Sequence, residues 1–217
     1  MHIVDGVLSA PVLIGGSLLA LAGIARGLHE LDPESIPQVG LFSAVFFLAS
    51  LIHVPVGLSS AHLMLTGLLG LLLGWAAFPA ILVGLVLQAV FFGFGGVTVI
   101  GVTTLNLALP AVVMGVLGRH LLWRFGGSPR SLGVLSLGFL VGALSIGLSA
   151  GLVAIVLALS GSEYRVAATV VMIGQLPVMV VEGLITAAAL RLILTVRPEL
   201  VPVGLGTDAL REQPQEA

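Results

Sequence analysis

The stretch SIPQVGLFSAVFFLASLIHVPVGLSSAHLMLTGLLGLLLGWAAFPAILVGLVLQAVFFGFGGVTVIGVTTLNLALPAVVMGVLG, residues 35–118, decides the fold because it contains no Asp, Glu, Lys or Arg. A helix that crosses a bilayer needs about 20 apolar residues, so this stretch alone has room for about four spans. A soluble core of that length would need polar outer faces, and this stretch does not supply them. We therefore expect a polytopic membrane protein.

The composition of the whole chain points the same way. Of its 217 residues, 58% are hydrophobic and 8% are charged, and the mean hydropathy is +1.22. Soluble domains carry roughly 25% charged residues. Cysteine is absent, which excludes disulfides and thiolate metal sites. Lysine is also absent, which excludes a Walker A ATPase loop and a retinal Schiff base. The net charge of −2 gives no indication of a nucleic-acid partner.

Seven apolar segments follow one another along the chain and predict an all-α bundle of about seven transmembrane helices. We interpret residues 1–198 as one transmembrane domain and residues 199–217 as a polar cytoplasmic tail. The predicted spans are residues 9–25, 37–53, 60–75, 79–100, 105–122, 132–159 and 166–194. Small residues recur four apart within them and are expected mainly to pack helices together, although some could dock a partner subunit. These pairs are Gly16 with Ala20, Gly70 with Gly74, Gly138 with Gly142, and Gly147 with Gly151.

The arginines predict the orientation of the bundle. With seven spans, only Arg165 falls on one side of the membrane, and the positive-inside rule makes the other, arginine-rich side cytoplasmic. The N-terminus is then expected outside, in the membrane of a bacterial cell. Because the first 25 residues lack the basic start of a signal peptide, Met1 and His2 are expected to remain. The arginines on the cytoplasmic side are Arg26, Arg119, Arg124, Arg130, Arg191, Arg197 and Arg211.

The outward-facing N-terminus suggests a metal site. The α-amine of Met1, the amide nitrogen of His2 and its imidazole can close two adjoining chelate rings on one ion. Such nitrogen ligands favour late first-row divalent metals over Mg²⁺ or Ca²⁺. His62 is expected just inside the outer start of the third span, after Ser59 and Ser60, which suit a helix N-cap. The positive end of that helix would keep His62 neutral and able to ligate. The alternatives are an incidental histidine at position two and a His62 bonded to a backbone carbonyl.

Other polar residues could support this site. Asp5 could orient the second imidazole nitrogen of His2, a common role of carboxylates around metal ligands, or could be a solvated turn residue. Ser60 is a further candidate near the outer face. Thr103 and Asn106 are expected to flank an outer loop after the fourth span, close to the proposed ion.

Three polar side chains are predicted deeper in the bundle. Gln88 and Gln175 are expected to form hydrogen bonds between helices. Glu182, in the middle of the last span, is costly to bury and marks either a transport pathway or a tight structural network. We prefer the structural or subunit-contact interpretation. His53, at the outer end of the second span, is interpreted as an interfacial residue.

Four blocks in order along the chain carry a family resemblance: MHIVDG at residues 1–6, LSSAH at 58–62, LQAVFFGFGGVT at 87–98 running on to Asn106, and QLP at 175–177 followed by EGLIT at 182–186. They resemble the CbiM/NikM family, the substrate-binding membrane components of energy-coupling-factor cobalt and nickel importers. The similarity covers nearly the whole chain. Phe94 and Thr103 depart from the family pattern, in which a polar residue and an Asn are usual.

The resemblance implies a metal site made of the Met1 amine, the amide and imidazole nitrogens of His2, and the imidazole of His62. It implies Co²⁺ or Ni²⁺ as the transported ion, with no other cofactor, and leaves the choice between the two metals open. It also implies four partners in the membrane complex: a coupling transmembrane subunit, two cytoplasmic ATPase subunits and a small accessory membrane subunit. The chain itself is then not an enzyme.

Two other functions were weighed. A stand-alone secondary transporter could use Glu182 as a proton relay, and would tolerate changes at Met1 and His2. An intramembrane hydrolase is excluded by the lack of a Gly-x-Ser-x-Gly motif or a recognisable nucleophile–base pair. The metal-capturing subunit is the prediction that we retain.

Overall fold

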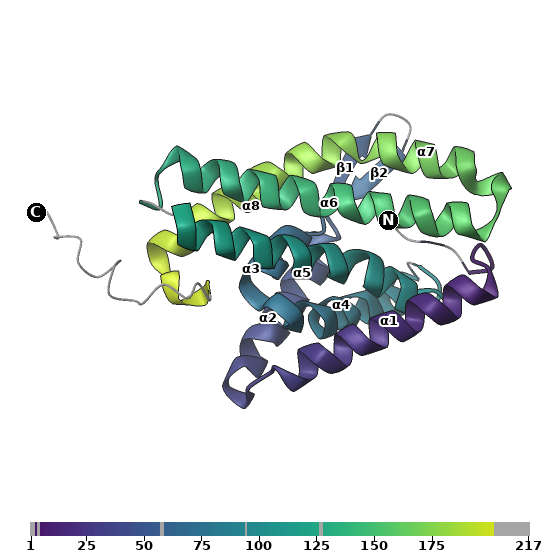
Figure 1. Cartoon of the computed structure of the whole chain (residues 1–217), viewed down its shortest axis with the longest axis horizontal. Coiled ribbons are helices and arrows are strands. Elements are labelled where there is room, and N and C mark those ends of the chain that lie inside the picture. Colours follow the sequence, from purple (N-terminus) through teal and green to yellow (C-terminus); the bar gives the residue numbers. More distant parts are fainter. Residues whose placement is uncertain (1–2, 4, 57–58, 94, 126–127, 202–217) are drawn as a thin grey trace, which may run out of the picture.

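The chain folds into a bundle of helices in the computed structural model (Figure 1). The structure describes residues 3, 5–56, 59–93, 95–125 and 128–201, with the backbone alone for residues 53–56, 59–61 and 125. The predicted ligands Met1 and His2, and the family departure Phe94, therefore lie outside the described residues.

Eight α-helices and one β-hairpin make up the described part of the chain. The helices are α1 Ala10–His29, α2 Ile36–Ala49, α3 Thr66–Leu73, α4 Ala77–Phe92, α5 Ile100–Phe125, α6 Leu132–Ser160, α7 Arg165–Gly174 and α8 Leu176–Val196. The hairpin pairs β1 His53–Val56 with β2 Ser59–His62 in antiparallel fashion. Four short 3₁₀ turns join these elements: η1 Pro33–Ser35, η2 Gly74–Ala76, η3 Ser162–Tyr164 and η4 Pro198–Leu200.

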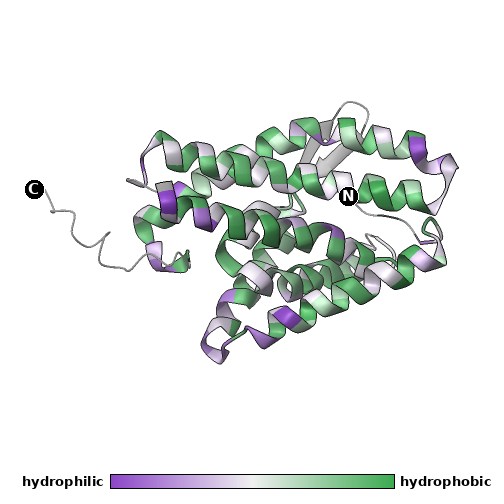
Figure 2. Cartoon of the chain, in the orientation of Figure 1, coloured by the Kyte–Doolittle hydropathy of each residue, from purple (hydrophilic) through white to green (hydrophobic). Residues whose placement is uncertain are grey.

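The prediction of an all-α polytopic membrane bundle is confirmed. Within the described residues, five helical stretches are long and apolar enough to cross a membrane: Ala10–His29, Thr66–Phe92, Ile100–Arg124, Leu132–Ser160 and Ser162–Val196. Hydrophobic residues line the helices along their lengths, and hydrophilic residues gather toward the ends (Figure 2). Large apolar side chains on the outside, such as Leu132 with 83% of its surface exposed, are suited to contact lipid. The number of spans and the orientation stay predictions.

The predicted helix start at the third span is wrong. Ser59 and Ser60 do not cap a helix, because they belong to β2, and α3 begins only at Thr66. Residue Leu65, just before α3, has a left-handed backbone with φ 53° and ψ 25°. That conformation is rare for a residue with a side chain, so the turn between strand and helix has to be stabilised from outside.

The fourth span is also shorter than predicted. Helix α4 ends at Phe92, and Gly93 follows it with a φ of 64°, the left-handed conformation that glycine adopts most easily after a helix. Helix α5 then begins at Ile100. The residues that we expected in an outer loop, 101–104, therefore form the first turn of α5.

Helix α3 lies inside the bundle and depends on glycines for its fit. Every residue from Thr66 to Leu72 is buried. A Cβ atom built on Gly70 would lie 1.7 Å from the carbonyl oxygen of Ala111 in α5, and one on Gly67 would lie 2.7 Å from the Cα of Gly142 in α6. The prediction that small residues pack helices together is thus confirmed for Gly70 and Gly142, whereas Gly151 meets nothing within 4 Å.

The last predicted span is two helices rather than one. Helix α7 ends at Gly174, Gln175 stands at the junction, and a proline occupies the first turn of α8. Proline lacks a backbone N–H and is tolerated at a helix start but not in the interior, which explains the break at this point. The two helices continue in sequence along α6 (Figure 1).

Candidate metal site

The structure places His62 at the end of β2, where the hairpin leads into the buried core. Its side chain is 7% exposed. In the hairpin register the Cα of His62 is paired with that of His53. The helix-end argument for a neutral His62 does not apply, because three residues separate it from the start of α3.

A buried carboxylate holds the segment directly after His62. Glu182 in α8 has no exposed surface. Its Oε1 accepts hydrogen bonds from the backbone N–H groups of Met64 and Leu65, and the distance from the Leu65 nitrogen is 2.9 Å. The same Leu65 nitrogen lies 3.0 Å from Oε2. Consecutive backbone N–H groups in such a turn form a concave anion-binding site, here filled by the chain's own carboxylate.

This contact bears on the alternatives that the sequence left open for Glu182. Its backbone contacts support the structural interpretation, because both oxygens are occupied by the turn that carries His62 into α3. The contact also accounts for the left-handed Leu65, since the hydrogen bonds from Met64 and Leu65 to Glu182 hold the turn in that backbone conformation.

A layer of hydroxyl groups continues from this turn across the bundle. Thr66 Oγ1 accepts a hydrogen bond of 3.0 Å from Ser145 in α6. One turn further along α6, Ser149 donates to the backbone carbonyl of Asn106 in α5 at 2.5 Å. Thr66, Ser145 and Ser149 were not among the predicted site residues. Two serines four apart within an apolar span were the available signal, because they lie on one helix face.

The N-terminal segment packs in a cluster further along α6. Ile3 is buried in a small cluster that includes Val99, just before α5, and Val153 in α6. Ser145 and Val153 are eight positions apart, about 12 Å along a helix axis. Thr66 therefore contacts the middle of α6, and the cluster around Ile3 includes α6 about two turns further on.

Asp5 is exposed, and its carboxylate contacts the loop before α5. Its Oδ1 accepts hydrogen bonds from the backbone N–H of Thr98, at 3.1 Å, and from the hydroxyl of that residue. A Cβ atom on Gly96 would lie 2.0 Å from the same oxygen, so the carboxylate sits tightly against this loop. Asp5 thus lies in an exposed turn, as the alternative interpretation expected, with its carboxylate bonded to Thr98. Its predicted role toward His2 lies outside the described residues.

The remaining predicted residues occupy separate places in the bundle. Thr103 and Asn106 are buried within α5, not beside a loop. Ser60 is part of β2. Gln88 in α4 has no exposed surface, and its amide makes no hydrogen bond with the described part of the chain, contrary to our expectation. Gln175 is likewise buried, and its Oε1 has no hydrogen-bond partner among the described residues.

Comparison with known proteins decides the family. Residues 2–200 match the family model CbiM, described as the cobalt uptake substrate-specific transmembrane region. The chain belongs to the CbiM family. It is therefore a membrane protein of a family for cobalt or nickel transport, which is not a family of catalytic enzymes.

Several CbiM-family relatives extend over most of the chain. A putative metal transport protein of Haemophilus influenzae is 40% identical over 204 residues, which cover 93% of this chain and 97% of that protein. The cobalt transport protein CbiM of Sorangium cellulosum is 31% identical over 217 residues, which cover 93% of this chain and 94% of that protein. A putative fused nickel transport protein NikMN of Archaeoglobus fulgidus is 29% identical over 207 residues, which cover 93% of this chain and 68% of that protein. The crystal structure of a truncated transition metal transporter has the same fold, with a TM-score of 0.67 at 24% identity over 92% of this chain and 99% of that one.

Proposed function

We propose that this CbiM-family chain is the metal-capturing subunit of an ATP-driven cobalt or nickel importer in the bacterial cytoplasmic membrane. The observation that carries the proposal is the family match over residues 2–200. The chain has no lysine for a Walker A loop, so the energy would come from ATPase partners. The fused NikMN relative, whose name joins two components, supports association with further transport subunits. These would be a coupling transmembrane subunit, two cytoplasmic ATPases and a small accessory membrane subunit.

The proposed ligands are the Met1 amine, the amide and imidazole nitrogens of His2, and the imidazole of His62. Two structural facts support this set. His62 is buried directly before a turn that Glu182 holds, and Ile3 belongs to a cluster that reaches α6 about two turns from the residue that Thr66 contacts. Four nitrogen ligands suit Co²⁺ or Ni²⁺, while the choice between them remains part of the proposal to be tested. Neither ion is a resident cofactor in this proposal, because the ion is the cargo.

The described supporting residues act at a distance from the ion in this proposal. Asp5 would fasten the N-terminal segment to the loop before α5 through Thr98, and Glu182 would fix the turn after His62. A stand-alone proton-coupled transporter is less favoured, because Glu182 binds two backbone N–H groups instead of standing in a polar path.

The test is metal content of the purified chain with an unmodified N-terminus. One alanine inserted between Met1 and His2, or His62→Ala, should abolish stoichiometric binding, because either change breaks the nitrogen set. His120→Ala is a matched control on an exposed histidine and should bind normally. Mass spectrometry with equal Co²⁺ and Ni²⁺ would report which metal is preferred. Normal binding by the insertion variant would refute the N-terminal site, and transport by the chain alone down a proton gradient would refute the subunit assignment.

A further inference from the structure

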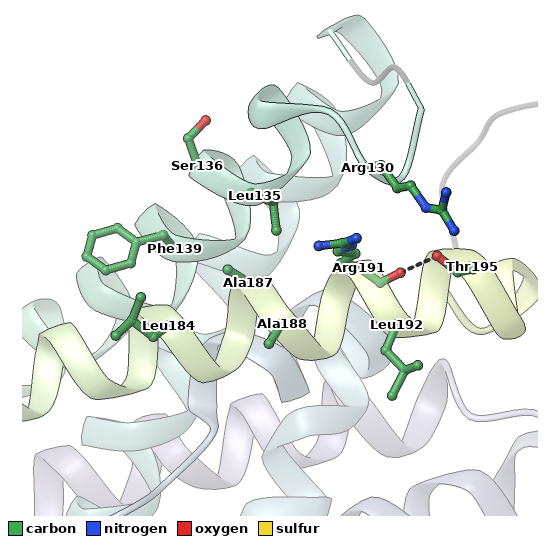
Figure 3. Close-up of a pocket in the computed structure, with 10 residues that line it drawn as sticks. All are labelled: Arg130, Leu135, Ser136, Phe139, Leu184, Ala187, Ala188, Arg191, Leu192 and Thr195. Atoms are coloured by element: carbon green, nitrogen blue, oxygen red, sulfur yellow. Dashed lines mark hydrogen bonds between the residues drawn. The ribbon is translucent and has the colours of Figure 1, made fainter.

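An apolar groove on the outside of the bundle ends at two arginines. It has a volume of about 680 Å³ and lies between α6 and α8 (Figure 3). Leu135 and Phe139 of α6 form one side, and Leu184 and Leu192 of α8 form the other. Arg130 and Arg191 both lie toward one end of it, beside Thr195 (Figure 3).

The groove exists because small residues line its floor. Ala187 and Ala188 of α8 lie between the larger side chains of the groove. The two helices approach closely there, since a Cβ atom on Gly138 would lie 2.8 Å from the Cα of Ala187. A larger residue at position 188, which is exposed, would fill the groove without entering the helix contact.

The charge in the groove is not balanced by the protein. The guanidinium groups of Arg130 and Arg191 form no ion pair or hydrogen bond with the described part of the chain. No acidic residue lines the groove. By contrast, Arg26 and Arg197 each pair with a nearby glutamate, to Glu30 at 2.7 Å and to Glu199 at 3.2 Å.

The shape and position of the groove match one leaflet of a bilayer. From Leu184 to Thr195 is eleven residues, about 17 Å along a helix. This is close to half of the ~30 Å hydrocarbon core, the depth that one acyl chain occupies. The arginines lie near the helix ends, because α6 begins at Leu132 and α8 ends at Val196. Their guanidinium groups can therefore reach the lipid headgroups, where the charged groups of long basic side chains in membrane proteins usually lie.

We propose that this groove, named here the α6–α8 groove, binds an anionic phospholipid, with an acyl chain over Ala187 and Ala188 and the phosphate between Arg130 and Arg191. Arginine forks match phosphate oxygens, and basic pockets between transmembrane helices select anionic headgroups. A helix from a partner subunit fits less well, because it would have to bury an acidic side chain within the membrane to meet the same charges. The inference does not depend on the metal site.

The experiment uses the full chain in detergent micelles doped with equal amounts of phosphatidylglycerol and phosphatidylcholine. Native mass spectrometry counts the retained lipid, and titration gives its dissociation constant. We expect one phosphatidylglycerol per chain. Arg130→Gln or Arg191→Gln should each weaken its binding about 5-fold and the double variant about 30-fold, from the typical contribution of one arginine near a membrane surface. Ala188→Trp should displace the lipid with both charges kept.

The controls separate this site from general surface charge. Arg165→Gln with Arg197→Gln removes two arginines that do not line the groove, and Val180→Trp adds an indole elsewhere on the exposed side of α8. Both should retain the lipid. Equal retention of phosphatidylcholine, retention by the Arg130/Arg191 double variant, or a coupling subunit bound over this groove in the intact importer would overturn the proposal. Displacement by millimolar inorganic phosphate would also overturn it, since that would indicate a free-anion site.

Discussion

At the scale of single residues, Glu182 joins α8 to the turn between β2 and α3. The burial of Glu182 can be predicted, because it is a polar residue within an apolar span. Its hydrogen-bond partners cannot be predicted, because they are backbone N–H groups, which nearly every residue type carries. The left-handed Leu65 is unpredictable for the same reason, since leucine rarely adopts that conformation by itself.

Replacing Glu182 should destabilise the whole bundle. Glu182→Ala leaves the N–H groups of Met64 and Leu65 buried without an acceptor, which costs about 2–4 kcal/mol in the free energy of unfolding. Glu182→Gln keeps one acceptor oxygen and should lose about half as much. Thermal unfolding in detergent measures the change, and amide hydrogen exchange at Met64 and Leu65 should accelerate. Glu34→Ala, at an exposed site, is the control. Unchanged exchange at both amides in Glu182→Ala would contradict the assignment.

At the scale of elements, the sequence was most informative where a helix is long and uniformly apolar. Helix α6 begins at the predicted residue 132 and ends one residue beyond the predicted 159. It was least informative at residues 53–66, where the predicted helix end and helix start are a hairpin and a turn. Valine and serine occur in both helices and strands, so the residue types in this segment do not distinguish the two structures. The contact that fixes the turn comes from Glu182 in α8, more than a hundred residues away.

The buried crossing of α3 and α5 should not tolerate a single added methyl group. A Cβ on Gly70 would lie 1.7 Å from a backbone oxygen of Ala111, so Gly70→Ala has to push the two helices apart. We expect a loss of at least about 3 kcal/mol, at the upper end of overpacking effects, measured as folded yield and melting temperature. Gly151→Ala changes the same residue type in an open position of α6 and should be neutral or slightly stabilising. Equal behaviour of the two variants would contradict the packing described here.

At the scale of the whole molecule, composition and charge were enough to predict a membrane bundle, and the resemblance of four sequence blocks predicted the correct family. The relative placement of His62 and the N-terminal segment was not readable, because it depends on how Thr66 and the cluster around Ile3 pack against α6. Burial of Thr103 and Asn106 inside α5 follows from the same packing.

The predicted orientation can be tested by labelling single introduced cysteines, because the chain has no cysteine of its own that would react. Ser162→Cys, at the exposed turn between α6 and α7, should react with a membrane-impermeant maleimide in intact cells. Ser128→Cys, exposed just before α6, should react only after the membrane is opened. The reverse pattern would place the N-terminus in the cytoplasm and would remove the proposed outward-facing metal site.

The bond between Glu182 and the turn after β2 also has a consequence for how the protein is made. The Leu65 amide and its acceptor are 117 residues apart in the chain. At ~5–20 residues per second, a ribosome takes about 6–23 s to add that length, so the turn is synthesised long before its carboxylate. The amides of Met64 and Leu65, in the turn before α3, must therefore be satisfied by other groups until α8 has been made. The turn is thus fastened by a helix that emerges much later than the turn itself.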